Sequence, residues 1–208
     1  MNQKNIHQLF AALSFIISFI VYLITMAPTT SLWDCGEFIA TSVIMGVPHP
    51  PGAPLYLIIG NVFSQLPFYE NIGARVNLIS PLVSALSVLF LYLIIVSLLK
   101  ILMSKKESSR NKNNIYSIYI SSFLASLAFA FSDSQWFNAV EAEVYSISTL
   151  FTALVVWLIL KWNEKSDNAG NIKYIILIFY ILGLAIGIHL LNLLTLPFIG
   201  LIILFNKK

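Results

Sequence analysis

The chain has 208 residues, of which 58% are hydrophobic and only 10% are charged. Soluble domains average about 25% charged residues, so this composition excludes an ordinary soluble globular protein. A net charge of +3 is only a weak hint of an acidic partner, and we expect no nucleic-acid partner. The single cysteine, Cys35, excludes an internal disulfide.

The membrane-spanning segments are predicted from stretches that contain no Asp, Glu, Lys or Arg. These stretches are 5–33, 76–99, 113–132, 144–160 and 174–206. One span of the hydrocarbon core needs about 20 apolar residues, so each of the first four holds one span. We read the first, from Leu9 to Ala27, as an uncleaved span rather than a signal peptide, because its hydrophobic run is too long.

The last charge-free stretch, 174–206, is too long for one upright helix. As a single helix it would measure about 50 Å, against a core of about 30 Å. We predict a hairpin with an external turn near Gly187–Asn192, and one tilted helix is the alternative. The fold class is then all-α: a polytopic membrane protein of about six transmembrane helices, forming one module over residues 1–208.

The basic residues predict the orientation in the membrane. With the N-terminus in the cytoplasm and alternating spans, eleven of the twelve Lys and Arg residues fall on the cytoplasmic side. Arg75 is the exception. The acidic residues show the opposite bias, since six of nine fall outside: Asp34, Glu37, Glu70, Asp133, Glu141 and Glu143.

The longest external segment, 28–74, is predicted to contain two short helices. Residues 37–46 can form an amphipathic helix that lies on the bilayer surface, and residues 55–66 are apolar but too short to cross. A rigid turn over His49–Pro54 separates them, because each proline fixes φ and removes a donor.

Functional side chains gather at four external places, each at the end of a span. They are Asp34 with Glu37; His49; Glu141 and Glu143 with Tyr145; and His189 with Asn192. Ionisable groups at one membrane depth are a functional hypothesis by default. We therefore expect Asp34, His49, Glu141 and His189 to surround one external cavity.

Each of these residues also has a purely structural interpretation. Asp34 and Glu37 could form a capping box at the start of a helix. Glu141 and Glu143 could be solvated acids favoured by a helix dipole. His49 could be a turn residue, and His189 and Asn192 could bond a neighbouring helix. Arg75 could snorkel to the interface.

The chemistry available to such a face is proton transfer and stabilisation of a phosphate. A general base must be a carboxylate or a histidine within hydrogen-bond reach, which favours Asp34 and Glu37. A departing phosphate needs donors or cations. The candidates for it are Arg75, His49, His189 and Asn192, with Glu141, Glu143 and Tyr145 also expected to line the substrate site.

A metal ion is a further option for the same face. Asp34 with Glu141 or Glu143 could hold Mg²⁺ or Mn²⁺, since both prefer oxygen ligands. The Glu-Ala-Glu spacing alone is weak support for a metal site. The sequence has no P-loop, no dinucleotide-binding fingerprint and no zinc-ligand spacing.

Four segments resemble a large bacterial membrane family long catalogued as a domain of unknown function. They are Pro28–Ala40, His49–Tyr56, Trp136–Tyr145 and Gly187–Asn192. That family is similar to a eukaryotic protein O-mannosyltransferase, and both resemble the GT-C superfamily of membrane glycosyltransferases. Cys35 stands where serine is commoner in the family, which leaves the neighbouring acid in place.

The resemblance implies a glycosyltransferase that uses a polyprenyl-phosphate sugar donor and inverts the anomeric centre. It implies Asp34 as the catalytic carboxylate with Glu37 as its helper, and an exported protein or a glycan as acceptor. The implied location is the bacterial inner membrane, with a periplasmic active face. GT-C enzymes usually carry more spans, so we expect this chain to be the N-terminal part of a longer protein, inactive by itself.

Two other classes of function compete with this interpretation. A transporter or flippase predicts ionisable groups in the middle of spans, and the first four charge-free runs have none. A membrane scaffold that binds a partner through 28–74 has no need for acids and histidines at one depth.

Overall fold

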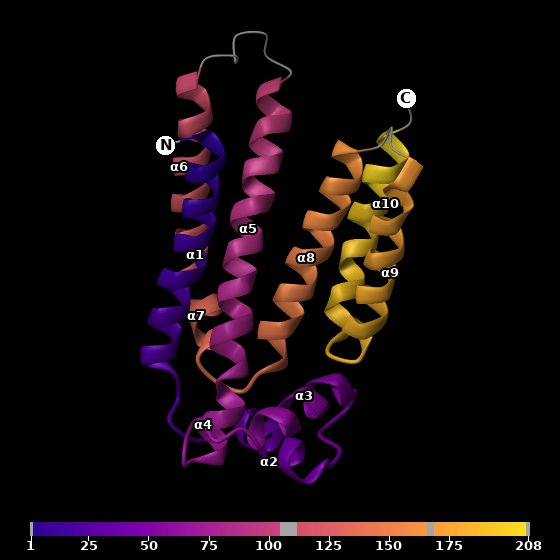
Figure 1. Ribbon diagram of the computed structural model, residues 1–208. Coiled ribbons are helices and arrows are strands. Elements are labelled where there is room, and N and C mark those ends of the chain that lie inside the picture. Colours follow the sequence, from indigo (N-terminus) through magenta and orange to yellow (C-terminus); the bar gives the residue numbers. More distant parts are fainter. Residues whose placement is uncertain (1, 105–111, 166–168, 207–208) are drawn as a thin grey trace.

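Long apolar helices dominate the computed structural model, which describes residues 2–104, 112–165 and 169–206. The described part is all-helical and contains no strand, which confirms the predicted fold class. Four helices form the main bundle: α1 (Gln3–Thr25), α5 (Ile79–Ser104), α6 (Lys112–Ala130) and α8 (Val144–Glu164). α5 packs against the other three (Figure 1).

Small side chains let these helices approach closely. Ser14 and Ser18 of α1, Ser84 of α5, and Ser122 and Ser126 of α6 are fully buried. Inside a membrane the hydrophobic effect does not drive helices together, so association depends on such close packing and on interhelical contacts. The buried serines therefore allow α1, α5 and α6 to pack closely.

The described residues confirm only part of the predicted number of spans. In the described residues three helices are long and apolar enough to cross a membrane, or four if the bent pair of α6 and α7 (Asp133–Ala139) is one span. The predicted count of six is not confirmed, because α9 (Ile172–Ile186) and α10 (Thr195–Phe205) have only 15 and 11 residues.

The stretch 174–206 is nevertheless a hairpin, as predicted. α9 ends at Ile186, the short 3₁₀ helix η3 (Leu190–Leu194) follows, and α10 returns to the end of the molecule where α9 began (Figure 1). Apolar side chains of α8, α9 and α10 share one core cluster, which includes Ile159, Ile178 and Ile199.

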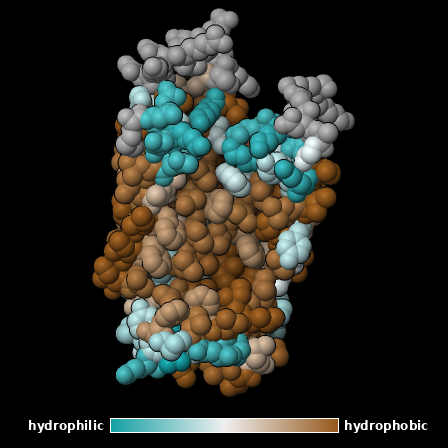
Figure 2. Space-filling model, viewed as in Figure 1, coloured by the Kyte–Doolittle hydropathy of each residue, from teal (hydrophilic) through white to brown (hydrophobic). Residues whose placement is uncertain are grey.

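Polar residues occupy the two ends of the bundle, with a hydrophobic band between them (Figure 2). Described lysines lie at helix ends that meet at one end: Lys4, Lys100, Lys161, Lys165 and Lys173. The opposite end holds α2 (Cys35–Ile44), α3 (Pro54–Ser64) and α4 (Ile72–Asn77). We call these the basic end and the acidic end.

The two helices expected in 28–74 are present as α2 and α3, and they pack closely on each other. Gly60 of α3 faces Ser42 of α2 so tightly that a Cβ atom at Gly60 would overlap the serine side chain. Asn61 donates hydrogen bonds to the carbonyls of Ser42 (2.9 Å) and Val43 (3.3 Å). We call α2 and α3 together the platform; Glu37 belongs to it, and Asp34 and His49 lie in the segments next to it.

Asn77 joins the platform to the rest of the molecule. Its buried amide donates to the carbonyls of Ala27 and Thr29, both at 2.8 Å. Its Oδ1 accepts from the Ala142 backbone N–H at 3.0 Å and from the Cys35 thiol at 3.6 Å. One side chain thus holds three segments that are far apart in sequence.

Replacing Asn77 with alanine is expected to lower the stability of the fold strongly. It would leave the buried Ala142 N–H without a partner and remove the two hydrogen bonds to Ala27 and Thr29, at a total cost of about 3 kcal/mol. The measurement is the midpoint of thermal unfolding in detergent. Asn61→Ala is the matched control, because water can replace its less buried hydrogen bonds, and equal losses in the two variants would contradict this role for Asn77.

Candidate active site

Asp34 lies immediately before α2, and its carboxylate is not used to cap that helix. Its backbone is α-helical (φ −78°, ψ −8°) and its side chain makes no capping hydrogen bond. The capping-box interpretation is therefore not supported. About half of the Asp34 side chain is exposed (52%), so the carboxylate is accessible to a substrate from outside.

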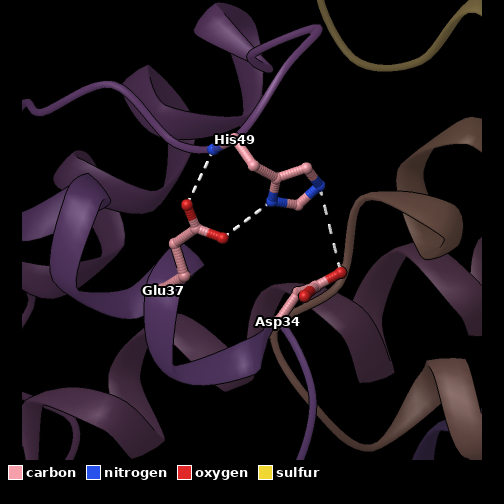
Figure 3. A group of neighbouring side chains, drawn as sticks. All are labelled: Asp34, Glu37 and His49. Atoms are coloured by element: carbon pink, nitrogen blue, oxygen red, sulfur yellow. Dashed lines mark hydrogen bonds and ion pairs between the residues drawn. The ribbon is translucent and has the colours of Figure 1, made fainter.

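Glu37 fixes the position of His49. One oxygen of Glu37 accepts the His49 backbone N–H at 2.7 Å, and the other bonds the His49 Nδ1 at 2.7 Å (Figure 3). This pair of bonds fastens the proline-rich turn onto the first turn of α2. Gly52, in the same turn, has φ +89°, a conformation that favours glycine.

The second nitrogen of the same ring faces Asp34. His49 Nε2 lies 4.0 Å from Asp34 Oδ2 (Figure 3). The hydrogen bond to Glu37 raises the pKa of His49 and lowers the pKa of Glu37. The imidazole is thereby oriented and held toward its cationic form beside the exposed carboxylate.

The two acids of the Glu-Ala-Glu segment are buried, so they are not solvated helix-dipole acids. Glu141 is 3% exposed and accepts a short hydrogen bond from the Ser31 hydroxyl. Glu143 is 4% exposed, and its Oε2 has no hydrogen-bond partner within the described residues. Burial, and secondarily the charge of Asp34, raises the pKa of Glu143 to about 7.

The turn of the α9–α10 hairpin closes the other side of the site. The Gly187 carbonyl accepts the Leu55 N–H at 2.9 Å, which docks the turn on the start of α3. His189 Nδ1 accepts the Leu191 N–H at 3.2 Å, and the ring packs against Tyr145 with centroids 5.2 Å apart. Since Nδ1 is an acceptor, a neutral His189 carries its proton on Nε2.

These groups line one cavity of about 40 Å³ at the acidic end. Asp34, His49, Glu143, Tyr145 and His189 contribute to it, together with Phe38, Pro51, Gly52, Ala53, Val144 and Ile188. We call it the acidic-end cavity. Its volume is that of one or a few water molecules, so a larger ligand would lie at its mouth, where Asp34 and His49 are half exposed.

The structure does not bring the remaining predicted residues into this cavity. Arg75 donates to the carbonyls of Tyr69 (2.6 Å), Ser64 (3.0 Å) and Glu70 (3.5 Å), and so closes the α3–α4 connection. Buried Asn192 donates to the Ser148 hydroxyl at 2.9 Å and accepts from Thr152 at 3.1 Å.

Glu141 points to Ser31, so Glu143 takes the place in the cavity that we expected for Glu141. Asn77 and Ser31 were missed by sequence reasoning. Asn77 lies inside a charge-free run that reads as lipid-embedded, and nothing in the sequence distinguishes Ser31 from its neighbours.

A divalent cation could be held by three of these side chains. Ligand atoms of Asp34, Glu37 and His49 lie within 4.8 Å of one another. Ligating histidines usually donate their second N–H to a carboxylate, which is the arrangement that Glu37 provides. Of the acids expected to share a metal with Asp34, Glu143 lies in the same cavity and Glu141 does not line it.

The fold and this site define a polytopic helical membrane protein with a carboxylate and histidine cavity at one end. The chain matches the family model described as the protein O-mannosyl-transferase TMEM260 N-terminal domain, over residues 34–208. The chain belongs to this family, which confirms the predicted relation to a eukaryotic protein O-mannosyltransferase.

Similar curated proteins agree with that assignment. The chain is 26% identical over 198 residues to protein O-mannosyl-transferase tmem260 of Dictyostelium discoideum, covering 89% of this chain and 22% of that protein. It is 27% identical over 146 residues to protein O-mannosyl-transferase TMEM260 of Mus musculus, covering 70% of this chain and 18% of that protein. The chain thus spans about a fifth of the length of these relatives. No solved structure matches it.

The burial of Glu143 predicts a pH-dependent stability. The folded chain keeps this carboxyl protonated up to about pH 7, whereas the unfolded chain releases the proton near its ordinary pKa of 4.5. Stability is therefore expected to fall as pH rises from 4.5 to 7, by on the order of 3 kcal/mol.

Thermal unfolding in detergent at several pH values measures this effect. Glu143→Gln should remove most of the decline, because the amide does not titrate. Asp133→Asn is the control, since Asp133 is an exposed acid at the start of α7. A decline of equal size in Glu143→Gln and in the unaltered chain would mean that other groups cause it.

Proposed function

We propose that this chain carries the catalytic face of a membrane glycosyltransferase of the GT-C type. The transferred group is a mannose-like sugar from a polyprenyl-phosphate donor, and the acceptor is a hydroxyl, such as a Ser or Thr of an exported protein. The observation that supports this most is the meeting of Asp34, His49 and Glu143 in one cavity at one end of the bundle.

In the proposed reaction Asp34 acts as the general base. It accepts the proton of the acceptor hydroxyl while the hydroxyl oxygen attacks C1 of the sugar. The bond between C1 and the lipid phosphate breaks, and the configuration at C1 inverts. The half-exposed position of Asp34 at the mouth of the cavity supports this role, since donor and acceptor must both reach it.

His49 neutralises the departing phosphate in this proposal. Its ring is fixed by Glu37 and held toward its cationic form, and its Nε2 lies on the same side as Asp34. A cation beside a developing phosphate charge lowers the barrier, provided that it is already in place before the reaction. His189 and Tyr145 also line the cavity and are proposed to contact the sugar or the phosphate.

In this proposal the donor carries a polyprenyl tail that dissolves in the membrane, so the enzyme must lie in the membrane to reach it. The hydrophobic band of the bundle would lie alongside the polyprenyl tail, with the sugar phosphate at the acidic end (Figure 2). We further propose that the acidic end is the non-cytoplasmic side, periplasmic in a bacterium, because the described lysines lie at the other end.

Asp34→Asn is expected to reduce sugar transfer by about 100-fold or more, because proton transfer by a positioned base contributes about that much. The assay uses membranes with the intact protein, radiolabelled polyprenyl-phosphate sugars and candidate acceptors. Asp133→Asn is the control and should retain full transfer. Full transfer by Asp34→Asn would sink the assignment of Asp34 as the base.

We also propose that Asp34, Glu37 and His49 can hold Mg²⁺ or Mn²⁺ at the same site. A cation bound there would supply positive charge for the leaving phosphate. One carboxylate oxygen can bind a cation while the other accepts a proton, so the two roles of Asp34 are compatible. A ligating His49 must be neutral, so a bound cation would replace the imidazolium as the positive charge beside the leaving phosphate. The mixed nitrogen and oxygen donor set suits Mn²⁺ well.

Binding of Mn²⁺ can be measured without any sugar, by the loss of the free-ion signal in electron paramagnetic resonance. His49→Ala is expected to weaken binding by about tenfold or more, the effect typical of losing a ligand or its orienting partner. Glu70→Gln, an exposed acid outside the group, is the control. Equal Mn²⁺ binding by all three proteins would exclude a site at these residues.

A further inference from the structure

A second, larger cavity lies at the basic end of the bundle, away from the site described above. Its volume is about 400 Å³, and residues of α1, α5 and α8 line it. They are His7; Leu93, Val96, Ser97, Lys100 and Ile101; and Trp157, Lys161 and Glu164. We call it the basic-end cavity.

The cavity exists because α5 and α8 diverge toward the basic end (Figure 1). Its α5 residues are spaced three or four apart, from Leu93 to Lys100, and so occupy one face of that helix. Trp157, Lys161 and Glu164 repeat this spacing on α8. Two helix faces that pack together at the acidic end thus leave a space between them at the basic end.

The charged residues of this cavity lie at its outer level, and apolar side chains predominate further in, where His7 bonds the Tyr92 hydroxyl. Lys100 and Lys161 lie at its outer level. Leu93 is seven residues, or about 10 Å, further toward the middle of the bundle than Lys100. A ligand that is charged at one end and mainly apolar at the other therefore matches these walls.

The charge at the outer level is positive. Lys161 Nζ pairs with Glu164 at 2.6 Å. Lys100 Nζ lies over the Tyr119 ring at 5.5 Å, and among the described residues no carboxylate pairs with it. Two lysines thus share one acid, which leaves an excess of positive charge for an anionic ligand.

We propose that the basic-end cavity binds an anionic phospholipid of the adjoining leaflet. Lys100 and Lys161 contact the phosphate oxygens, and an acyl chain lies against Leu93, Val96 and Trp157. Basic pockets between membrane helices recognise lipid headgroups by this chemistry. The proposal does not depend on sugar transfer, because no residue of the acidic-end cavity takes part.

The test is a lipid titration of the purified intact protein in detergent, read by native mass spectrometry. The probes are phosphatidylglycerol, phosphatidylcholine with the same acyl chains, and glycerol phosphate as the soluble headgroup. We expect phosphatidylglycerol to bind most tightly, because only it combines net negative charge with acyl chains.

The key variant is the double substitution Lys100→Gln with Lys161→Gln. A lysine at this level contributes about fivefold to binding of an anionic lipid, so the pair should lose about 25-fold in affinity. The matched control is Lys165→Gln with Lys173→Gln, which removes the same charge at the same end but outside this cavity. The control should change affinity by less than about twofold.

A conservative variant separates charge from folding. Lys100→Arg with Lys161→Arg keeps both charges and should retain phosphatidylglycerol binding. Equal losses in the glutamine double variant and its control would mean general attraction to a basic surface, which overturns the proposal. Affinity that is unchanged in every variant, as expected if another polypeptide segment fills the cavity, overturns it too. So does glycerol phosphate binding as tight as that of the lipid.

Discussion

The acidic end of this protein depends on the hydrogen bonds made by the Asn77 side chain. Its amide group makes hydrogen bonds to backbone groups of the segment after α1 and of the segment before α8. It also accepts a hydrogen bond from the thiol of Cys35, the residue next to Asp34. Asn77 itself and its partners Cys35 and Ala142 are buried, so one side chain sets the relative positions of both segments. The distance between Asp34 and the Glu141–Glu143 segment follows from that arrangement.

Burial of Glu143 is a consequence of the same arrangement. Its backbone neighbour Ala142 is held by Asn77, and the buried side chain of Glu143 lines the acidic-end cavity. A carboxyl group in such a position prefers its neutral form, because burial disfavours its charge. The protein therefore has carboxyl groups of unlike character in one cavity, an exposed one at Asp34 and a buried one at Glu143. Sites of proton transfer often show such a pairing.

Much of the fold could be predicted because it depends on composition along the chain. Charge-free runs gave the long helices, and the length of 174–206 required a turn near Gly187. Both short helices of the first loop could be read from the break at His49–Pro54. The number of complete spans could not be predicted in the same way. α9 and α10 are apolar, but each is shorter than a helix that crosses the membrane.

The site was harder to predict because it depends on side-chain direction. Glu141 and Glu143 are two residues apart, so an extended segment would place both on the same side. Bends at residues 140–142 instead send Glu141 to Ser31 and leave Glu143 in the cavity, and the sequence does not reveal those bends. Arg75 was a plausible phosphate ligand by charge, yet backbone carbonyls engage it. Glu37 and His49 could be listed as candidates, but only the fold shows that they bond each other.

The most direct test of this account is the titration of Glu143 itself. Infrared difference spectroscopy of the protein with isotope-labelled glutamate can follow its carboxyl band with pH, once Glu143→Gln has shown which band belongs to it. We predict that Glu143 titrates near pH 7, and that Asp34→Asn lowers its pKa, because the charge of Asp34 contributes to the shift. A Glu143 that titrates near 4.5 in both proteins would contradict the shared cavity.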